Sequence, residues 1–451
     1  MTRRLFVAVL GLVLCGVAHG YPIAEERRLG ESFAIEAAAA LPLVREPAVV
    51  DFVTRLGQRI VDRLDSPQPF EYRFGVVQDD SMNAFAVPGG FVYLNTGVLL
   101  RAGNESELAG VLAHEIGHSH AHHFVRQQEE GKLLGYAALA GALLSILHPA
   151  IGAVAAGIEA TQQLKYQRQF EEEADYLAVR YVQAAGFDPH GLTSFMKRLW
   201  NEQRTSPLDQ VPPYLLTHPV TDERISNLEA ATKDVAVQPD SQRPTFALER
   251  VQAIARALGG RQKAPKHRQP TGGSGGRALA LQGISLLYGG DAAGAAPALE
   301  EARAPGLEEI DDDLALARFR NGDLEGAQRA ARRRLEEAPQ DAVARALLGG
   351  VLVASKDYAG AIKELEPVSR EAPELDQAQY DLGQAYGRNG SEALGFYHLA
   401  RAFEMRGDVS GALAQYRKAA KGLPPDSEEA ATTKQRVEVL QEVAHRSIVG
   451  R

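Results

Sequence analysis

The sequence predicts a mainly α protein of the α+β class, in which a helical domain with one small sheet is followed by an α-helical solenoid. Residues 21–258 show helical patterning with a single short strand-like segment. A Gly/Pro-rich basic stretch occupies 259–276, and residues 277–446 are periodic and rich in Ala, Leu and Glu. We therefore expect two folded domains, 21–258 and 277–446, joined by a linker or mobile loop.

The composition is that of a folded, acidic protein. The 451 residues are 45% hydrophobic and 24% charged, and 49 Lys and Arg against 58 Asp and Glu give a net charge of −9. This length is enough for two or three domains, and the composition excludes disordered, collagen-like and disulfide-framework proteins. Because no overall basic excess exists to hold a phosphate backbone, we expect no nucleic acid partner.

The N-terminus has the features of a secretory signal peptide. Two arginines precede a 13-residue apolar run, Leu5–Val17, and small residues, Ala18 and Gly20, lie at positions −3 and −1 of a cleavage site. This run is shorter than the about 20 residues that a membrane-spanning helix needs. We expect export with removal of residues 1–20 by cleavage after Gly20, and lipidation at Cys15 is the alternative. Since Cys15 is the only cysteine, the exported chain would have no thiol chemistry.

The C-terminal domain repeats with a 34-residue period. Pro305, Pro339 and Pro373 are 34 residues apart, and the motif Asp-x-x-Gly-Ala occurs four times. Helix–turn–helix units of this length, with small residues where the helices touch, resemble tetratricopeptide repeats. The usual tryptophan is missing, and an extra helix at 391–406 interrupts the register. The concave face of such a solenoid usually binds another protein, so we expect a protein partner there.

A metal-binding motif follows a predicted helix start at Asn104. The residues are His114-Glu115-x-x-His118. Two histidines four residues apart on a helix face the same way and can bind one ion, while Glu115 can reach a metal-bound water from a neighbouring face. This is the arrangement of zinc hydrolases. We therefore expect His114 and His118 to bind zinc and Glu115 to act as the general base.

A catalytic zinc needs a third protein ligand, and the sequence offers one on a second helix. Residues 165–182 contain the motif Glu-x-x-Ala-Asp, which begins at Glu171. Glu171 can complete a His-His-Glu set, and Asp175 can accept a hydrogen bond from the outer N–H of a ligating histidine. Glu172 and Glu173 are alternatives by composition, but the spacing favours Glu171.

Three further histidines, His120, His122 and His123, follow the motif. Histidines stacked along one straight helix cannot close around a single ion. We therefore expect these three to form a polar helix end, where the C-terminal dipole favours histidine.

Together the two metal-binding motifs resemble those of the HtpX-like and CAAX-prenyl-protease-like zinc endopeptidases. With the signal peptide and the repeats, the chain is similar to the periplasmic, repeat-containing branch of that family. The resemblance implies a zincin-like metallopeptidase domain at 21–258, one Zn²⁺ per chain and hydrolysis of peptide bonds in protein substrates. It also implies a periplasmic role in outer-membrane protein quality control, with the outer-membrane assembly machinery as a partner of the repeats.

The resemblance assigns a substrate-binding strand. Residues 83–86 are similar to the family's strand at the active-site cleft, whose unpaired edge can pair with an extended substrate. From the residues alone an ordinary core hairpin is nearly as good an interpretation. The residues are Asn83, Ala84, Phe85 and Ala86.

The resemblance also assigns a loop histidine. Thr-His-Pro at His218, with Arg224 beyond it, resembles a family loop that places a histidine at the metal. There His218 could occupy the open coordination position and hold the enzyme latent, or swing away and stabilise the oxyanion. On this basis we expect His218 to be catalytic and Arg224 to support the metal-binding residues.

Residues 133–158 contain no charged side chain and are long enough to span a bilayer. A single crossing would place His118 and Glu171 on opposite sides of the membrane, so we expect a buried helical pair with possible peripheral membrane contact. Two rival functions stay open. One is a chaperone or assembly scaffold whose zinc site is latent because His218 caps it, and the other is a membrane-embedded protease.

Overall fold

The computed structural model describes six segments of the chain, which are 23–66, 69–129, 168–205, 213–237, 243–260 and 275–449. The expected signal peptide at 1–20, residues 261–274 of the expected linker, and the apolar segment 133–158 lie outside these residues. Among the described residues, no helix is both long enough and apolar enough to cross a membrane.

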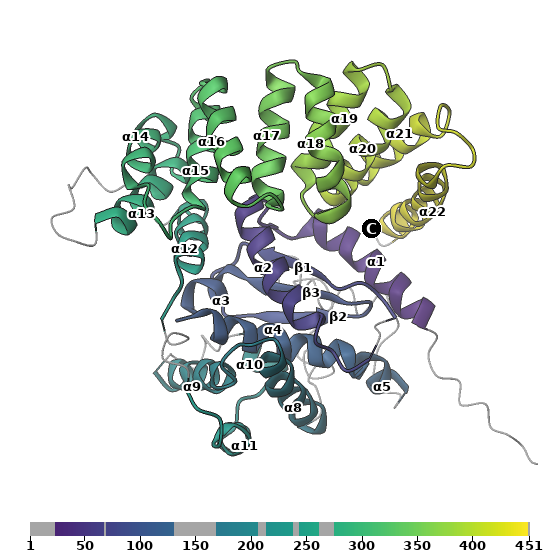
Figure 1. The fold of residues 1–451 in the computed structure, drawn as a ribbon. Coiled ribbons are helices and arrows are strands. Elements are labelled where there is room, and N and C mark those ends of the chain that lie inside the picture. Colours follow the sequence, from purple (N-terminus) through teal and green to yellow (C-terminus); the bar gives the residue numbers. More distant parts are fainter. Residues whose placement is uncertain are drawn as a thin grey trace, which may run out of the picture.

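The N-terminal half forms a small sheet surrounded by helices (Figure 1). Its elements are α1 (Ile23–Ala40), α2 (Pro47–Val61), β1 (Arg73–Val77), β2 (Ala84–Val87), β3 (Phe91–Asn95), α3 (Thr96–Arg101), α4 (Glu105–His120), α5 (His123–Glu129), α8 (Arg168–Ala184), α9 (His190–Thr205), α10 (Pro213–Thr217), α11 (Asp222–Thr232) and α12 (Phe246–Leu258).

The three strands lie in the order β1-β3-β2, with β3 parallel to β1 and antiparallel to β2. A strand therefore forms at the segment expected at 83–86, with the observed bounds Ala84–Val87, and it lies at an edge of the sheet. Its register pairs Ala84 with Leu94 and Phe85 with Tyr93. Among the described residues no further strand pairs with its outer side.

Both faces of this sheet are covered by helices. Because alternate residues of a strand point to opposite sides, β3 contributes to a separate cluster on each face. Phe91 and Tyr93 pack with Phe33 of α1 in one buried cluster. Val92 and Leu94 point the other way and belong to the main core, which includes residues of α2 and α4. The central strand β3 is buried along its whole length. The sheet is thus a rigid layer between α1 and the helix that carries the metal-binding motif.

The C-terminal half is an arc of antiparallel helix pairs (Figure 1). Its elements are α13 (Gly275–Tyr288), α14 (Ala292–Ala302), α15 (Ile310–Arg320), α16 (Leu324–Glu337), α17 (Ala342–Ala354), α18 (Tyr358–Glu371), α19 (Asp376–Arg388), α20 (Glu392–Met405), α21 (Val409–Ala419) and α22 (Glu428–Val449). The extra helix expected at 391–406 is α20.

The repeated Asp-x-x-Gly-Ala motif explains how these helices begin. In each copy the aspartate carboxylate accepts a hydrogen bond, 2.8 or 2.9 Å long, from the backbone N–H of the glycine. A Cβ on any of these glycines would overlap that carboxylate, and the alanine that follows is fully buried. The cap therefore requires the aspartate, the space beside its carboxylate requires the glycine, and the close packing of the helices requires the alanine. The four copies begin at Asp291, Asp323, Asp357 and Asp408.

The arc is joined to the N-terminal half through α1 and α2, which lie between the repeat helices and the sheet (Figure 1). Ile35 of α1 packs in one buried cluster with Tyr397 and Tyr416 of the arc. Beside it, Arg436 of α22 forms an ion pair with Glu31 of α1 at 2.8 Å. Part of the arc's inner side is thus covered by the chain's own N-terminal helices.

A buried charged cluster makes a second connection. Arg250 of α12 pairs with Asp313 of α15, with Nε and Oδ2 2.6 Å apart. Tyr288 of α13 donates a hydrogen bond to Glu46, which immediately precedes α2. Because a buried charge is costly once its partner is lost, these contacts favour one fixed arrangement of the two halves.

We predict that Gly407→Ala will weaken the contact between the arc and α1. Gly407 lies between α20 and α21 with a φ of 73°, and a Cβ there would overlap the backbone of Ala39 in α1. This overlap should lower the free energy of unfolding by about 1–3 kcal/mol, the usual range for overpacking. Chemical denaturation measures the loss.

Gly390→Ala is the matched control for this variant. Gly390 lies in the preceding turn with a φ of 93°, but a Cβ there meets nothing within 4 Å. It should show only the conformational penalty of about 1–2 kcal/mol for an L-residue at positive φ. Equal losses in the two variants would contradict a tight α1 contact.

Candidate active site

Helix α4 carries His114, Glu115 and His118 through the centre of the N-terminal half. The Asn104 side chain caps this helix by accepting a hydrogen bond from the Glu107 N–H at 2.9 Å. Every residue from Ser106 to Ser119 is buried. The motif is therefore held on a rigid, solvent-excluded helix.

Helix α8 approaches α4 closely at Gly117. A Cβ on Gly117 would lie 3.3 Å from the carbonyl oxygen of Ala174, which is a tight contact, so the absence of a side chain at Gly117 favours this approach. Glu171 lies one turn before Ala174 and is 2% exposed. The Gly in the first motif and the Ala in the second therefore bring Glu171 to the two histidines.

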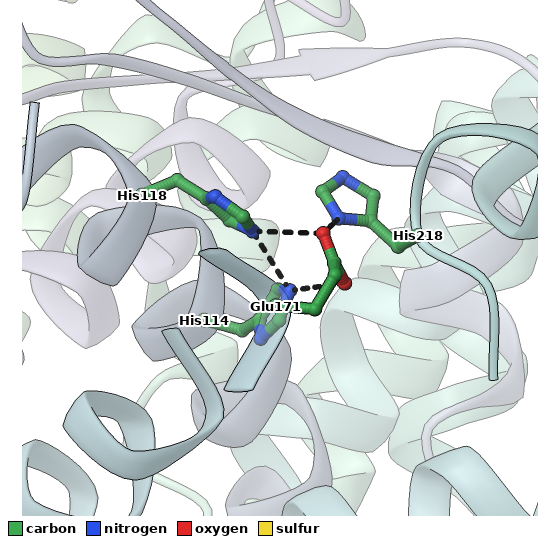
Figure 2. Close-up of side chains that lie close together, drawn as sticks. All are labelled: His114, His118, Glu171 and His218. Atoms are coloured by element: carbon green, nitrogen blue, oxygen red, sulfur yellow. Dashed lines mark hydrogen bonds and ion pairs between the residues drawn. The ribbon is translucent and has the colours of Figure 1, made fainter. Parts of the chain in front are cut away.

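The side chains of His114, His118, Glu171 and His218 converge (Figure 2). The Nε2 atoms of His114 and His118 are 3.1 Å apart. Oxygens of the Glu171 carboxylate lie 3.6 Å from His114 Nε2 and 3.4 Å from His118 Nε2. His218 Nδ1 lies 3.0 Å from Glu171 Oε1. One ligand atom from each residue falls within 4.8 Å of the others. Two or three imidazoles and a carboxylate are a donor set that suits zinc.

Asp175 and Arg224 hold this cluster from behind. Asp175 Oδ1 lies 2.9 Å from His114 Nδ1, the nitrogen that faces away from the cluster. Arg224 donates two hydrogen bonds of 2.7 Å to Asp175, and its Nη1 lies 2.7 Å from Glu171 Oε2. The structure thus places both residues where the sequence analysis expected support for the metal-binding groups.

The electrostatics of the cluster favour a cation. Burial by itself would raise the pKa of Glu171, but the facing His218 and hydrogen bonds from the three histidines hold that pKa well below its usual value. Burial by itself would lower the pKa of His114, but Asp175 and Glu171 raise it to about 9. The Glu171 carboxylate is therefore ionised beside the imidazoles, which favours a positive charge in this buried site.

Glu115 lies beside the cluster with a completely buried carboxylate. Among the described residues, neither of its oxygens accepts a hydrogen bond, and Oε1 lies 3.7 Å from His218 Nε2. A buried carboxylate without hydrogen bonds is expensive in a structural role. Its placement suits a group that exchanges a proton with a bound water or substrate.

The prediction of a polar helix end is wrong for His123. His120 and His122 are partly exposed, but His123 is fully buried between His118 and α8. The backbone of His122 has a φ of 52°, a left-handed conformation that ends α4 and turns the chain back. His123 therefore returns toward the site, which helical spacing from His118 does not predict.

Tyr214 is a further residue that sequence reasoning missed. It lies on α10, and its carbonyl accepts a hydrogen bond of 2.7 Å from the N–H of His218. The Tyr214 ring packs on the His218 ring with centroids 4.7 Å apart. The Tyr214 N–H also donates to the carbonyl of Met82, just before β2. Tyr214 therefore ties the His218 loop to the edge strand.

Comparison with known proteins agrees with this geometry. Residues 50–232 match the model of peptidase family M48, and residues 313–373 and 370–428 match tetratricopeptide repeats. The chain therefore contains a peptidase family M48 domain. The resemblance to a metallopeptidase family and the tetratricopeptide repeats that the sequence predicts are both confirmed.

Relatives of the M48 domain include proteases from bacteria and fungi. The chain is 32% identical over 213 residues to the beta-barrel assembly-enhancing protease of Escherichia coli, covering 46% of this chain and 43% of that protein. It is 36% identical over 229 residues to a putative beta-barrel assembly-enhancing protease of Vibrio cholerae, covering 48% and 46%. It is 26% identical over 201 residues to the mitochondrial metalloendopeptidase OMA1 of Schizosaccharomyces pombe, covering 42% and 55%. The matches span about half the length of these relatives.

We predict that the M48 domain binds one zinc ion per chain through this cluster. Zinc at a hundredfold excess over its Kd should raise the free energy of unfolding by about 2.7 kcal/mol, because only the folded chain holds the site together. Glu171→Gln should lose most of this stabilisation, since a neutral amide replaces the carboxylate. Metal analysis after dialysis and thermal unfolding with added zinc measure the effect.

The matched control is Glu172→Gln. Glu172 is the next residue on α8, but its side chain is exposed and pairs with Arg168 at 3.2 Å. This variant should bind zinc as the wild type does. Undiminished zinc binding by the Glu171 variant would remove Glu171 from the ligand set.

Proposed function

We propose that this protein is an exported zinc metalloendopeptidase that hydrolyses peptide bonds in protein substrates. The single observation that carries the proposal is the buried convergence of His114, His118 and Glu171, with the Glu115 carboxylate beside them. Nitrogen and carboxylate ligands with an adjacent free carboxylate are the elements of zinc-dependent hydrolysis.

In this mechanism His114, His118 and Glu171 hold the zinc. When bound, zinc lowers the pKa of a coordinated water to about 7 and polarises the scissile carbonyl. Glu115 accepts a proton from the attacking water on its carboxylate and then delivers it to the nitrogen of the leaving amine. Burial excludes competing solvent from this exchange, which strengthens each electrostatic interaction.

His218 has two roles in the proposal. At rest it caps the site, since its Nδ1 lies among the ligand atoms at 3.0 Å from Glu171. When displaced, it would stabilise the oxyanion that forms on the substrate carbonyl. The substrate itself would lie along the outer edge of β2, where Asn83, Ala84, Phe85 and Ala86 offer their backbone to an extended chain.

The proposed biological setting is the periplasm, with envelope or outer-membrane protein quality control as the task. The names of the bacterial relatives support this setting. The repeat domain would bind clients or a partner such as the outer-membrane assembly machinery, since stacked helical repeats present extended binding surfaces. The second candidate is a chaperone or assembly scaffold with a latent site, which the position of His218 at the cluster favours.

We predict that Glu115→Gln will keep its zinc and its fold but lose casein cleavage. The amide cannot accept the proton of the attacking water, so turnover should fall by about 10²–10⁴-fold. The test uses the chain from Tyr21, with zinc content and thermal unfolding as controls. Cleavage by this variant at the wild-type rate would refute the assignment of Glu115.

We predict that His218→Ala will cleave casein several-fold faster than the wild type, because removing the cap opens the position that water and substrate need. Zinc content must stay at one per chain for the comparison to hold. If neither protein cleaves casein while both retain zinc and client binding, the scaffold is the better interpretation. A slower variant would show instead that loss of the oxyanion role outweighs removal of the cap.

A further inference from the structure

His123 connects a predicted zinc ligand to a carboxylate on another helix. Its ring is fully buried at the start of α5. His123 Nδ1 lies 2.9 Å from His118 Nδ1, and His123 Nε2 lies 3.1 Å from Glu173 Oε2 on α8. His118 directs its other nitrogen, Nε2, toward His114 and Glu171. One imidazole therefore bridges the outer side of a ligand ring and α8.

The chemistry of His118 determines where the protons lie. A neutral imidazole that binds a metal through Nε2 carries its proton on Nδ1. That N–H can donate to His123 only if His123 Nδ1 is unprotonated, so the proton of a neutral His123 is on Nε2. His123 Nε2–H then faces the Glu173 carboxylate. In this arrangement each donor meets an acceptor, and the opposite tautomer of His123 would place two N–H groups against each other.

We propose that His123 is a positioning residue that accepts a hydrogen bond from His118 Nδ1–H and fixes the tautomer and orientation of that ring for metal binding. It acts on His118 as Asp175 acts on His114. The inference rests on the proposed zinc site but concerns a residue that the zinc-binding motifs do not include. His114 and His118 thus differ in their outer partners, since His114 faces the Asp175 carboxylate and His118 faces a neutral acceptor, His123.

The surroundings of His123 hold its ring in one orientation. The ring stacks on Phe170 with centroids 4.5 Å apart and an interplanar angle of 16°. Arg126 pairs with Glu173 at 2.8 Å, and its guanidinium lies 4.8 Å from the centre of the Phe170 ring. Phe170 immediately precedes Glu171, so the contacts that hold His123 also hold the start of the helix that supplies the third ligand.

Two variants of similar size separate this role from packing. His123→Asn keeps an acceptor, since its Oδ1 occupies the place of Nδ1, whereas His123→Leu has a similar shape and no acceptor. Competition with a chelator measures the zinc affinity of each full-length chain. We expect the Leu variant to bind zinc about 10–100-fold more weakly than the wild type, the usual effect of losing such a partner. The Asn variant should lie much closer to the wild type.

Two further measurements complete the test. Thermal unfolding of the metal-free proteins shows whether both variants are folded to the same extent. The visible absorption of Co²⁺-loaded protein reports ligand geometry, and it should change in the Leu variant but not in the Asn variant.

The inference and the proposed function fail in different ways. Equal zinc affinity in wild type and both variants would overturn the positioning role while leaving the zinc site intact. Equal weakening in the Asn and Leu variants would also overturn it, because loss of packing alone would then explain the effect. A wild-type chain that binds no zinc would instead refute the proposed function.

Discussion

The close approach of α4 and α8 at Gly117 and Ala174 is the constraint on which the site depends. The His-Glu-x-x-His motif alone provides two ligands on one helix face, and the third must come from a second backbone. Small residues at the crossing let Glu171 reach His114 and His118 within 3.6 Å. A side chain at Gly117 would crowd the backbone of Ala174 and so oppose this approach.

This approach places several ionisable groups in a buried site, and their mutual pairing makes that tolerable. Arg224 contacts Asp175 and Glu171 together, so one guanidinium balances two carboxylates. Removing one member of such a network leaves its partners buried and uncompensated. The cost in folding free energy is therefore larger than the contribution of the one contact that is lost. Glu115 differs from these groups, because neither of its carboxylate oxygens accepts a hydrogen bond from the described residues.

The solenoid contributes to the same architecture. Its inner side packs on α1 and α2, and α1 packs in turn on the sheet whose edge strand adjoins the His218 loop through Tyr214. The repeats and the M48 domain are therefore linked by continuous packing, with α1 between them (Figure 1). A partner that binds the repeats would meet an inner surface already partly occupied by the chain itself.

The repeats, the helix caps and the spacing of the metal-binding motifs follow from the sequence alone, because these depend on residues within one or two turns of each other. The period of the prolines and the Asp-x-x-Gly-Ala motif predicted the solenoid, and the four-residue spacing of His114 and His118 predicted a shared ion. The burial of His123, the packing of Tyr214 on His218 and the placement of α1 against the repeats depend instead on how the elements pack in three dimensions. Each of these arises where a turn or a long-range contact brings together residues that local periodicity does not relate.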